Sequence, residues 1–321
     1  MPPQGRLTAE RAALEMVAAW MGGRFYRTFR ITDDIPDSVD AILAQRDRQI
    51  GVTISTLWDA ESDSEGRDFS ELVASDLLDD DTGGYAVWLP PGAEIPIEEP
   101  ARSDLRLLLS GGMRGLQPEE RREVRIPVTL QLAKIQTDGA YVSVTGGLSS
   151  HWTTISEGID GAFHLDSRPL HRLPEEAAEL DIIISRVRDR AELLSAEEFT
   201  EVHVHDYWLV SRLPAASPAG VTMVTAPPDL DPKDGVPIRR SFRRAVQRAM
   251  EQRRSTDADL SVLVLLGALA HIEDELATAA LKGMNPASYG ALDLIVLVAD
   301  GQVRQVLQPR SLPWEQDRNN A

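Results

Sequence analysis

Residues 39–57, VDAILAQRDRQIGVTISTL, decide which fold the sequence predicts. Two apolar runs rich in β-branched residues, VDAILA and IGVTISTL, enclose the polar segment QRDRQ. Because β-branched residues favour strands and polar residues favour turns, we predict a β-hairpin here. Its first strand carries an acidic residue, Asp40.

A helix is predicted directly before this hairpin, in residues 8–21, TAERAALEMVAAWM. Four apolar residues recur there at helical spacing and form one stripe, namely Leu14, Val17, Ala18 and Met21. Gly22 and Gly23 follow, and such residues end helices. The same segment carries two glutamates, Glu10 and Glu15.

The last hundred residues predict a second group of elements that completes a sheet. Residues 236–254 are expected to form a helix and LSVLVLLGA a buried strand, followed by the helix IEDELATAALKGM. DLIVLVADGQVRQVL then predicts two strands around the tight turn Asp300-Gly301. We therefore expect an α/β fold with a mixed central sheet flanked by helices, formed by residues 1–58 and 236–310.

Residues 59–235 are expected to form a large β-rich α+β insertion or a second domain. VRIPVTLQLAKI and AYVSVTG flank residues 136–139, QTDG, which predicts a β-hairpin. A helix is expected at 175–194, and FTEVHVHDYWLVSRL alternates like a strand. Residues 311–321 are interpreted as a flexible tail.

The composition limits the classes of function. The chain has no cysteine, so thiolate metal sites and cysteine nucleophiles are excluded. Neither a signal peptide nor a membrane-spanning run is recognisable, and we expect a cytoplasmic protein without membrane contact. The formal net charge of −18 repels nucleic acid, so any such contact requires a local basic face.

A helix with a glutamate, a strand with an aspartate and a second strand about ten residues later resemble the PD-(D/E)XK nuclease superfamily. The resemblance covers residues 8–58 and 236–308 and implies a restriction-endonuclease-like core. It assigns Asp40 as the first metal ligand and Glu15 or Glu10 as the helix glutamate. Mg²⁺ or Mn²⁺ would be the cofactor if the site were active.

The residues that such a site needs for cleavage are absent from the second strand. Gly51 stands where the acidic ligand belongs, and Thr53 stands where the lysine belongs. The chain has only three lysines, all far from Asp40 in sequence, namely Lys134, Lys233 and Lys282. An arginine such as Arg46 or Arg48 cannot replace this lysine as a base, because a guanidinium stays protonated.

We therefore expect a non-catalytic protein that binds or scaffolds other molecules and has a protein partner. The resemblance alone would place it in a bacterial nucleic-acid-processing or defence assembly. Three alternatives stay open. One is an active metal-dependent nuclease or phosphodiesterase whose site is completed by Asp59 or Glu61. Another is an acidic structural protein that recognises a basic partner, and the third is an unrelated α/β sheet.

The predicted helix at 236–254 carries a row of arginines that could contact nucleic acid. Arg240, Arg244 and Arg248 recur every four residues, opposite an apolar stripe that contains Phe242. Such a row can follow phosphates. The interpretation that we favour from sequence is a solvated face that pairs with the protein's own acids.

Two histidines on one predicted strand, His203 and His205, could share a transition metal because residues i and i+2 point to one face. Asp206 is adjacent. A third ligand would have to come from His151, His164 or His171. The alternative is that these are ordinary histidines on a strand surface.

Overall fold

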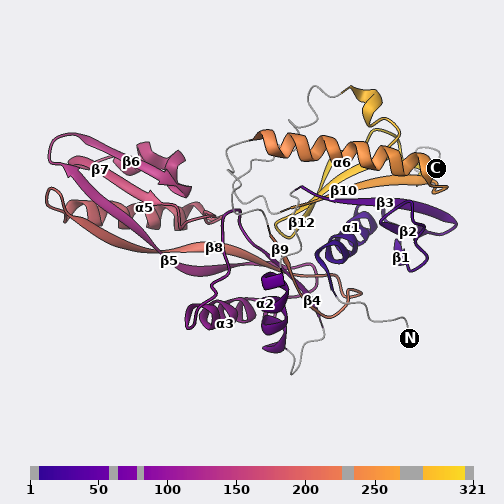
Figure 1. The fold of residues 1–321 in the computed structure, drawn as a ribbon, viewed down its shortest axis with the longest axis horizontal. Helices are drawn as coiled ribbons and strands as arrows, with labels where there is room; N and C mark the ends of the chain where they lie inside the picture. Colours follow the sequence, from indigo (N-terminus) through magenta and orange to yellow (C-terminus); the bar gives the residue numbers. More distant parts are fainter. Residues whose placement is uncertain (1–6, 58–63, 78–82, 226–234, 268–284, 315–321) are drawn as a thin grey trace. The chain divides into compact units, whose positions relative to one another are not determined.

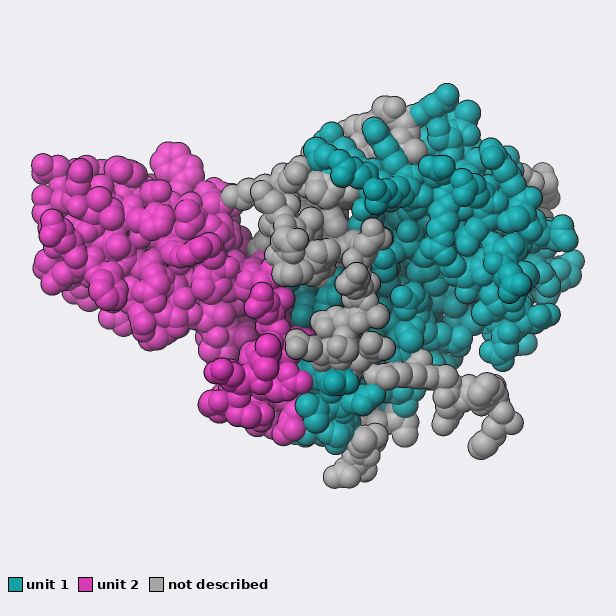
Figure 2. All heavy atoms as spheres, in the orientation of Figure 1, with its two compact units in different colours: residues 1–91, 109–122, 209–321 teal, residues 92–108, 123–208 magenta. Residues whose placement is uncertain are grey.

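The computed structural model describes the chain except for residues 1–6, 58–63, 78–82, 226–234, 268–284 and 315–321 (Figure 1). The chain divides into two compact units (Figure 2). Unit 1 contains residues 1–91, 109–122 and 209–321, and unit 2 contains residues 92–108 and 123–208. The helix expected at 272–284 lies outside the described residues, as do Asp59, Glu61 and most of the expected tail.

A six-stranded mixed sheet, called sheet A below, forms the centre of unit 1. Its spatial order is β1 (Arg30–Thr32), β2 (Ala41–Gln45), β3 (Arg48–Thr56), β10 (Leu260–Gly267), β11 (Leu294–Ala299) and β12 (Gln302–Leu307). β1, β2 and β3 form an antiparallel meander, so the hairpin predicted in residues 39–57 is confirmed. β10 is parallel to β3, and β11 is parallel to β10. β12 is the last strand and is antiparallel to β11. The chain is thus a mixed α/β protein.

Two long helices, α1 (Ala9–Phe25) and α6 (Gly235–Ser255), cover opposite faces of sheet A (Figure 1). Successive residues of a strand point to opposite faces, so alternate strand residues separate into two cores. Ile50, Val52 and Ile54 share a core with the buried residues of α1. Leu263 and Leu265 share the other core with α6.

α1 is covered on a second side by two strands that lie outside sheet A. β4 (Gly84–Trp88) pairs in parallel with β9 (Gly220–Val224), and both strands contact α1. Ala86, Trp88 and Val224 belong to the same core as α1. This packing explains why the observed division differs from the expected one. Parts of 59–235 join the core formed by the two ends of the chain, as does α2 (Ser64–Ser75), which contacts β9.

Unit 2 has its own core and contains four strands of a second six-stranded sheet. The spatial order of this sheet is β6 (Ala140–Gly146), β7 (Gly161–Ser167), β5 (Arg121–Gln136), β8 (Phe199–Arg212), β4 and β9. The core includes Phe163 and Leu165 of β7, and it also includes Ile183 and Val187 of α5 (Ala177–Glu192). Unit 2 also contains η1 (Gly147–His151), α4 (Trp152–Ser156) and the first part of α3 (Ala101–Met113). The last residues of β8 pair with β4 and belong to unit 1.

The hairpin expected across residues 136–139 is wrong, because β7 lies between β5 and β6. β7 is antiparallel to β5 and parallel to β6. Gly161, at the start of β7, donates its N–H to the carbonyl of Gly139 at 2.7 Å. A Cβ at Gly161 would lie 2.8 Å from the carbonyl oxygen of Gln136, so only glycine allows this close approach. The turn signal was local, whereas the pairing depended on a strand more than twenty residues later.

Candidate functional site

Asp40 is held in a closed set of contacts directly before β2. Its Oδ2 accepts the backbone N–H of Ile54 at 2.8 Å, and its Oδ1 accepts a hydrogen bond from Arg248 Nη2 at 2.5 Å. Arg248 Nη1 in turn donates to the carbonyl oxygen of Ile54 at 3.0 Å. Both carboxylate oxygens are therefore engaged in joining β2, β3 and α6. Asp40 therefore has a structural role. To bind a metal ion, its carboxylate would have to break these hydrogen bonds.

Glu15 lies on the other side of sheet A and has a different partner. Its side chain is buried on α1 and accepts from Arg11 Nε at 3.0 Å, with Arg11 Nη2 at 2.7 Å. Burial raises the pKa of Glu15, and the Arg11 guanidinium partly opposes this rise. Glu10 is exposed on the same helix. Since Asp40 bonds to α6 and Glu15 belongs to α1, the structure does not bring the two expected ligands together.

Gly51 and Thr53 stand at the two positions where the sequence departs from the superfamily pattern. Gly51 is closely packed, and Thr53 forms a hydrogen bond. A Cβ at Gly51 would lie 3.2 Å from Val39 Cγ1 and 3.3 Å from the Cβ of Ala258. Thr53 is buried and donates its hydroxyl to Gln252 Oε1 on α6. Within the described ranges, no three histidines or carboxylates gather in a way that could hold a metal ion.

The histidines of β8 have separate surroundings from the aspartate beside them. His203 Nδ1 lies 3.1 Å from Thr129 Oγ1. The pKa of His205 is lowered by burial and by the cationic neighbours Arg125 and Arg186, which also disfavour a metal cation. Burial alternates along the strand, so buried Asp206 points to the face opposite these two side chains.

Asp206 is instead the centre of a buried cluster in unit 2. It is 1% exposed and accepts from the backbone N–H groups of His171 at 3.0 Å and Arg172 at 2.7 Å. These two groups donate to Oδ1. Oδ2 accepts the indole N–H of Trp208 at 3.0 Å and lies 3.0 Å from His171 Nδ1. These donors satisfy the carboxylate and fix the loop after β7 to β8. His171 is thereby separated from the pair with which it was expected to share a metal.

The exposed side of α6 carries a group of arginines. Arg239, Arg240, Arg243 and Arg244, together called the α6 arginine face below, are all exposed. They line one hollow of 450 Å³ together with Val236 and Gln247. A second hollow of 530 Å³ continues toward the end of the helix and includes Arg243 and Arg254. The predicted residues Arg240 and Arg244 thus lie in a wider basic surface.

The third arginine of the predicted row has a different environment. Arg248 makes the ion pair with Asp40, so it stabilises the fold of unit 1. By contrast, Arg239, Arg240, Arg243 and Arg254 form no ion pair with any described residue. Among the described residues, pairing with the protein's own acids therefore accounts for Arg248 and gives these four no partner. The row predicted from the spacing of four does not include Arg239 and Arg243, which form the adjacent row.

Comparisons with known proteins do not identify a relative of this chain. No family model, no curated protein and no solved structure matches it. None of the helices in the described parts of the chain is both long enough and apolar enough to cross a membrane.

Proposed function

We propose that this chain binds a polyanion through the α6 arginine face and that nucleic acid is its ligand. The observation that carries the proposal is the group of four exposed arginines that line one hollow on α6. Arginine suits this role because its planar guanidinium can donate two parallel hydrogen bonds to one phosphate.

The charge of the whole chain makes this surface unusual. The chain has 51 acidic and 33 basic residues, so an average surface would repel nucleic acid. Concentrating exposed arginines on one helix creates a local attraction within an acidic body. That contrast also restricts the orientation in which a polyanion can approach, because other surfaces remain repulsive.

The chemistry of the face favours contact with the phosphate backbone over recognition of bases. Arg239 and Arg254 are separated by roughly 22 Å along the helix axis, which is long enough to contact several phosphates. No described residue on the exposed side of α6 is aromatic, so bases have nothing to stack on. Binding is therefore expected to depend steeply on salt and weakly on sequence.

A binding role without cleavage also agrees with the surroundings of Asp40. An α-β-β-β order followed by α6 and β10 supports the proposed relation to the nuclease superfamily. We propose a member that kept the core and lost the metal site, since Asp40 bonds to Arg248 and Glu15 bonds to Arg11. Such a protein would act as a scaffold that holds nucleic acid for a protein partner.

Fluorescence anisotropy with a labelled duplex of about 20 base pairs tests the proposal. We expect Arg239→Glu/Arg243→Glu to weaken binding at least about tenfold at low salt, because two phosphate contacts become repulsive. The slope of log K against log salt should decrease by roughly 2. The matched control is Arg24→Glu/Arg190→Glu, which changes the net charge equally at two exposed arginines elsewhere.

Two results would contradict the proposal. One is the absence of binding by the wild-type chain at low salt, and the other is an equal loss of affinity in the control. Incubation of the same duplex with Mg²⁺ or Mn²⁺ tests the alternative enzyme. Cleavage that is abolished by Asp40→Asn would show a metal-dependent nuclease and overturn the non-catalytic part of the proposal.

A further inference from the structure

A second basic pocket lies away from the α6 arginine face, where α1 ends and the β2–β3 hairpin turns. It has a volume of 550 Å³, within the range of about 300–1,000 Å³ that is typical of small-molecule sites. Three of its lining residues are arginines, Arg27, Arg30 and Arg46. No acidic residue is among the described residues that line it. This pocket is therefore positively charged in a chain whose net charge is −18. Such a pocket would attract an anionic ligand.

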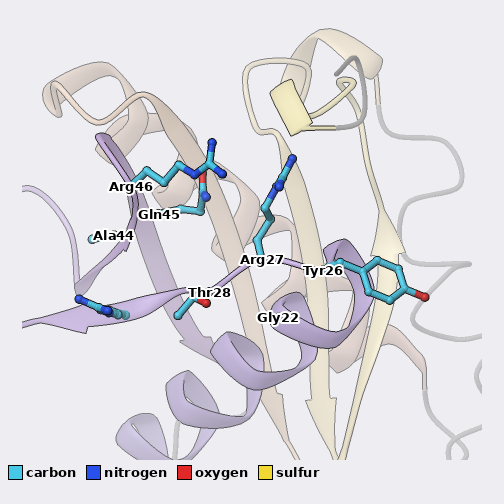
Figure 3. Close-up of a pocket in the computed structure, with 8 residues that line it drawn as sticks. Gly22, Tyr26, Arg27, Thr28, Ala44, Gln45 and Arg46 are labelled. Carbon is cyan, nitrogen blue, oxygen red and sulfur yellow. The ribbon is translucent and has the colours of Figure 1, made fainter. Parts of the chain in front are cut away.

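Gln45 adds an uncharged polar group to this pocket (Figure 3). The residue is 4% exposed, and its amide forms no hydrogen bond with any described residue. Its amide is therefore available to a bound polar molecule.

The backbone around the pocket holds its side chains in place. Arg30 lies opposite Ala44 in the pairing of β1 with β2, which brings Arg30 near Gln45 and Arg46 at the end of that strand. Arg46 and Tyr26 both have positive φ, at 57° and 55°, a conformation that L residues rarely adopt. Glycine or asparagine would fit these positions with less strain. Retaining a long cationic and an aromatic side chain there is consistent with a use for both.

The carboxyl end of α1 disfavours an anion in the pocket, but neighbouring backbone N–H groups offset this effect. The carboxyl end of a helix is partially negative, and α1 ends here. However, the backbone N–H groups of Tyr26 and Arg27 both donate to the carbonyl oxygen of Gly22, which lines the pocket. Arg30 and Arg46 have no ion-pair partner among the described residues, so their charge is available to a ligand.

We propose that this pocket binds a nucleoside phosphate. Arg27, Arg30 and Arg46 would hold the phosphate, since guanidinium groups pair with phosphate oxygens. The Gln45 amide would donate to a phosphate or sugar oxygen. The ring of Tyr26 is 73% exposed and lies at the other end of the pocket, where it offers a flat surface for a base (Figure 3). The site is distinct from the α6 arginine face and does not depend on the function proposed for that face.

Isothermal titration calorimetry with four separate probes tests this assignment: AMP, ribose 5-phosphate, inorganic phosphate and adenosine. We expect AMP to bind with a Kd below about 1 mM. Ribose 5-phosphate and inorganic phosphate should bind more weakly because they lack the base. Adenosine should bind at least about tenfold more weakly than AMP, because it lacks the charged group that the arginines hold.

Variants separate this site from general charge effects. Arg30→Glu/Arg46→Glu should weaken AMP binding at least about tenfold, and Arg46→Gln alone about threefold or more. Gln45→Leu should cause a loss of about threefold or more, because it removes a buried hydrogen bond. Arg24→Glu, outside the pocket, and Arg239→Glu/Arg243→Glu on α6 should keep affinity within about twofold. Thermal unfolding verifies that each variant is folded.

The proposal is overturned by any of four results. The first is a wild-type Kd for AMP above 1 mM. The second is adenosine binding as tightly as AMP, which would exclude a phosphate site. The third is an equal loss of AMP affinity in the pocket variant, in Arg24→Glu and in the α6 variant, which would indicate attraction by overall charge. The fourth is a loss in the α6 variant alone, which would assign AMP to the nucleic-acid surface and leave the proposed function intact.

Discussion

The two faces of sheet A carry helices with opposite relations to solvent. α1 is packed between the sheet and the strands β4 and β9, so its buried residues include even a glutamate, Glu15. α6 buries one stripe that contains Phe242 and Val246, and its other side is exposed and rich in arginine. Most of α1 is therefore packed into the core, whereas α6 contributes one face to the core and the opposite face to an exposed surface.

On each face of sheet A, a carboxylate also pairs with an arginine of the same face. Glu15 pairs with Arg11 on the α1 face, and Asp40 pairs with Arg248 on the α6 face. A metal site would need these two carboxylates to share one cation. Because each has its own arginine and the sheet separates them, the two acids act as independent parts of the fold. The following substitutions can break or sharpen this difference, from the largest expected effect to the smallest.

Introducing an acid and a lysine on β3 with Gly51→Glu/Thr53→Lys should destabilise unit 1 by about 3–5 kcal/mol without producing cleavage. The glutamate would press against Val39 and Ala258, and the lysine would bury a charge where Thr53 now bonds to Gln252. Urea unfolding measures the change in free energy. A stable double variant that cleaves DNA with Mg²⁺ would show that the α6 face still has room for a metal site.

Removing a large buried side chain from either face should have a similar cost. Phe242→Ala on α6 should reduce the free energy of unfolding by about 3–5 kcal/mol, and Met21→Ala on α1 by about 2–5 kcal/mol. Both side chains are almost completely buried, so both variants leave a cavity. Urea unfolding compares the two. If Phe242→Ala cost less than 1 kcal/mol, the contribution of α6 to the core would be refuted.

Two substitutions of Asp40 should differ in stability. Asp40→Ala removes the acceptor of the Ile54 N–H and is expected to cost about 1–3 kcal/mol. Asp40→Asn keeps an acceptor there and loses mainly the partly exposed pair with Arg248, so it should cost about 1 kcal/mol or less. Chemical denaturation distinguishes them. Equal costs would mean that the hydrogen bond to Ile54 contributes nothing.

The smallest effect is expected for Glu15→Gln, and it should depend on pH. The pKa of Glu15 is raised in the folded state, so the folded chain holds this proton more tightly than the unfolded chain. Stability from this group is therefore complete below the unfolded value of 4.5 and decreases as pH rises through the higher folded value. At pH 7 the ionised, buried carboxylate costs free energy that glutamine avoids.

We therefore expect Glu15→Gln to equal or exceed wild type at pH 7 by less than about 1 kcal/mol, with the advantage lost at pH 4. Urea unfolding at pH 4, 5.5 and 7 measures this difference. Glu10→Gln is the matched control, since Glu10 is exposed on the same helix. Destabilisation by Glu15→Gln at pH 7 that disappears at pH 4 would reverse the predicted sign and show that the Arg11 pair outweighs burial.

Local patterns predicted the elements whose signals lie within a few residues. The apolar run LSVLVLLG forms β10, in which every residue is buried. Asp300 and Gly301 both have positive φ and join β11 to β12, as the Asp-Gly pair indicates. The apolar stripe of α6 is buried as its helical spacing predicts. In each of these elements, one periodicity or one turn residue determines the outcome.

Patterns that depend on distant partners could not be interpreted in the same way. The turn at 136–139 is a strong hairpin signal, yet β7 separates β5 from β6. The row Arg240, Arg244 and Arg248 looks uniform in sequence, but Arg248 pairs with Asp40, 208 residues away. Nothing near Gln45 in the sequence indicates that it lines a pocket together with Arg27 and Arg30.

The sequence by itself therefore determined an acidic α/β chain without cysteine, the hairpin at 39–57 and the arginine-rich helix. It also determined that β3 carries neither an acid at Gly51 nor a lysine at Thr53. Composition, strand alternation and helical period are local properties, and they need no partner to be recognised. Only the tertiary structure decided that Asp40 and Glu15 lie on opposite faces of sheet A and which arginines stay exposed. The reason is physical: the role of a charged side chain depends on its burial and its nearest opposite charge, and both are set by segments far apart in the chain.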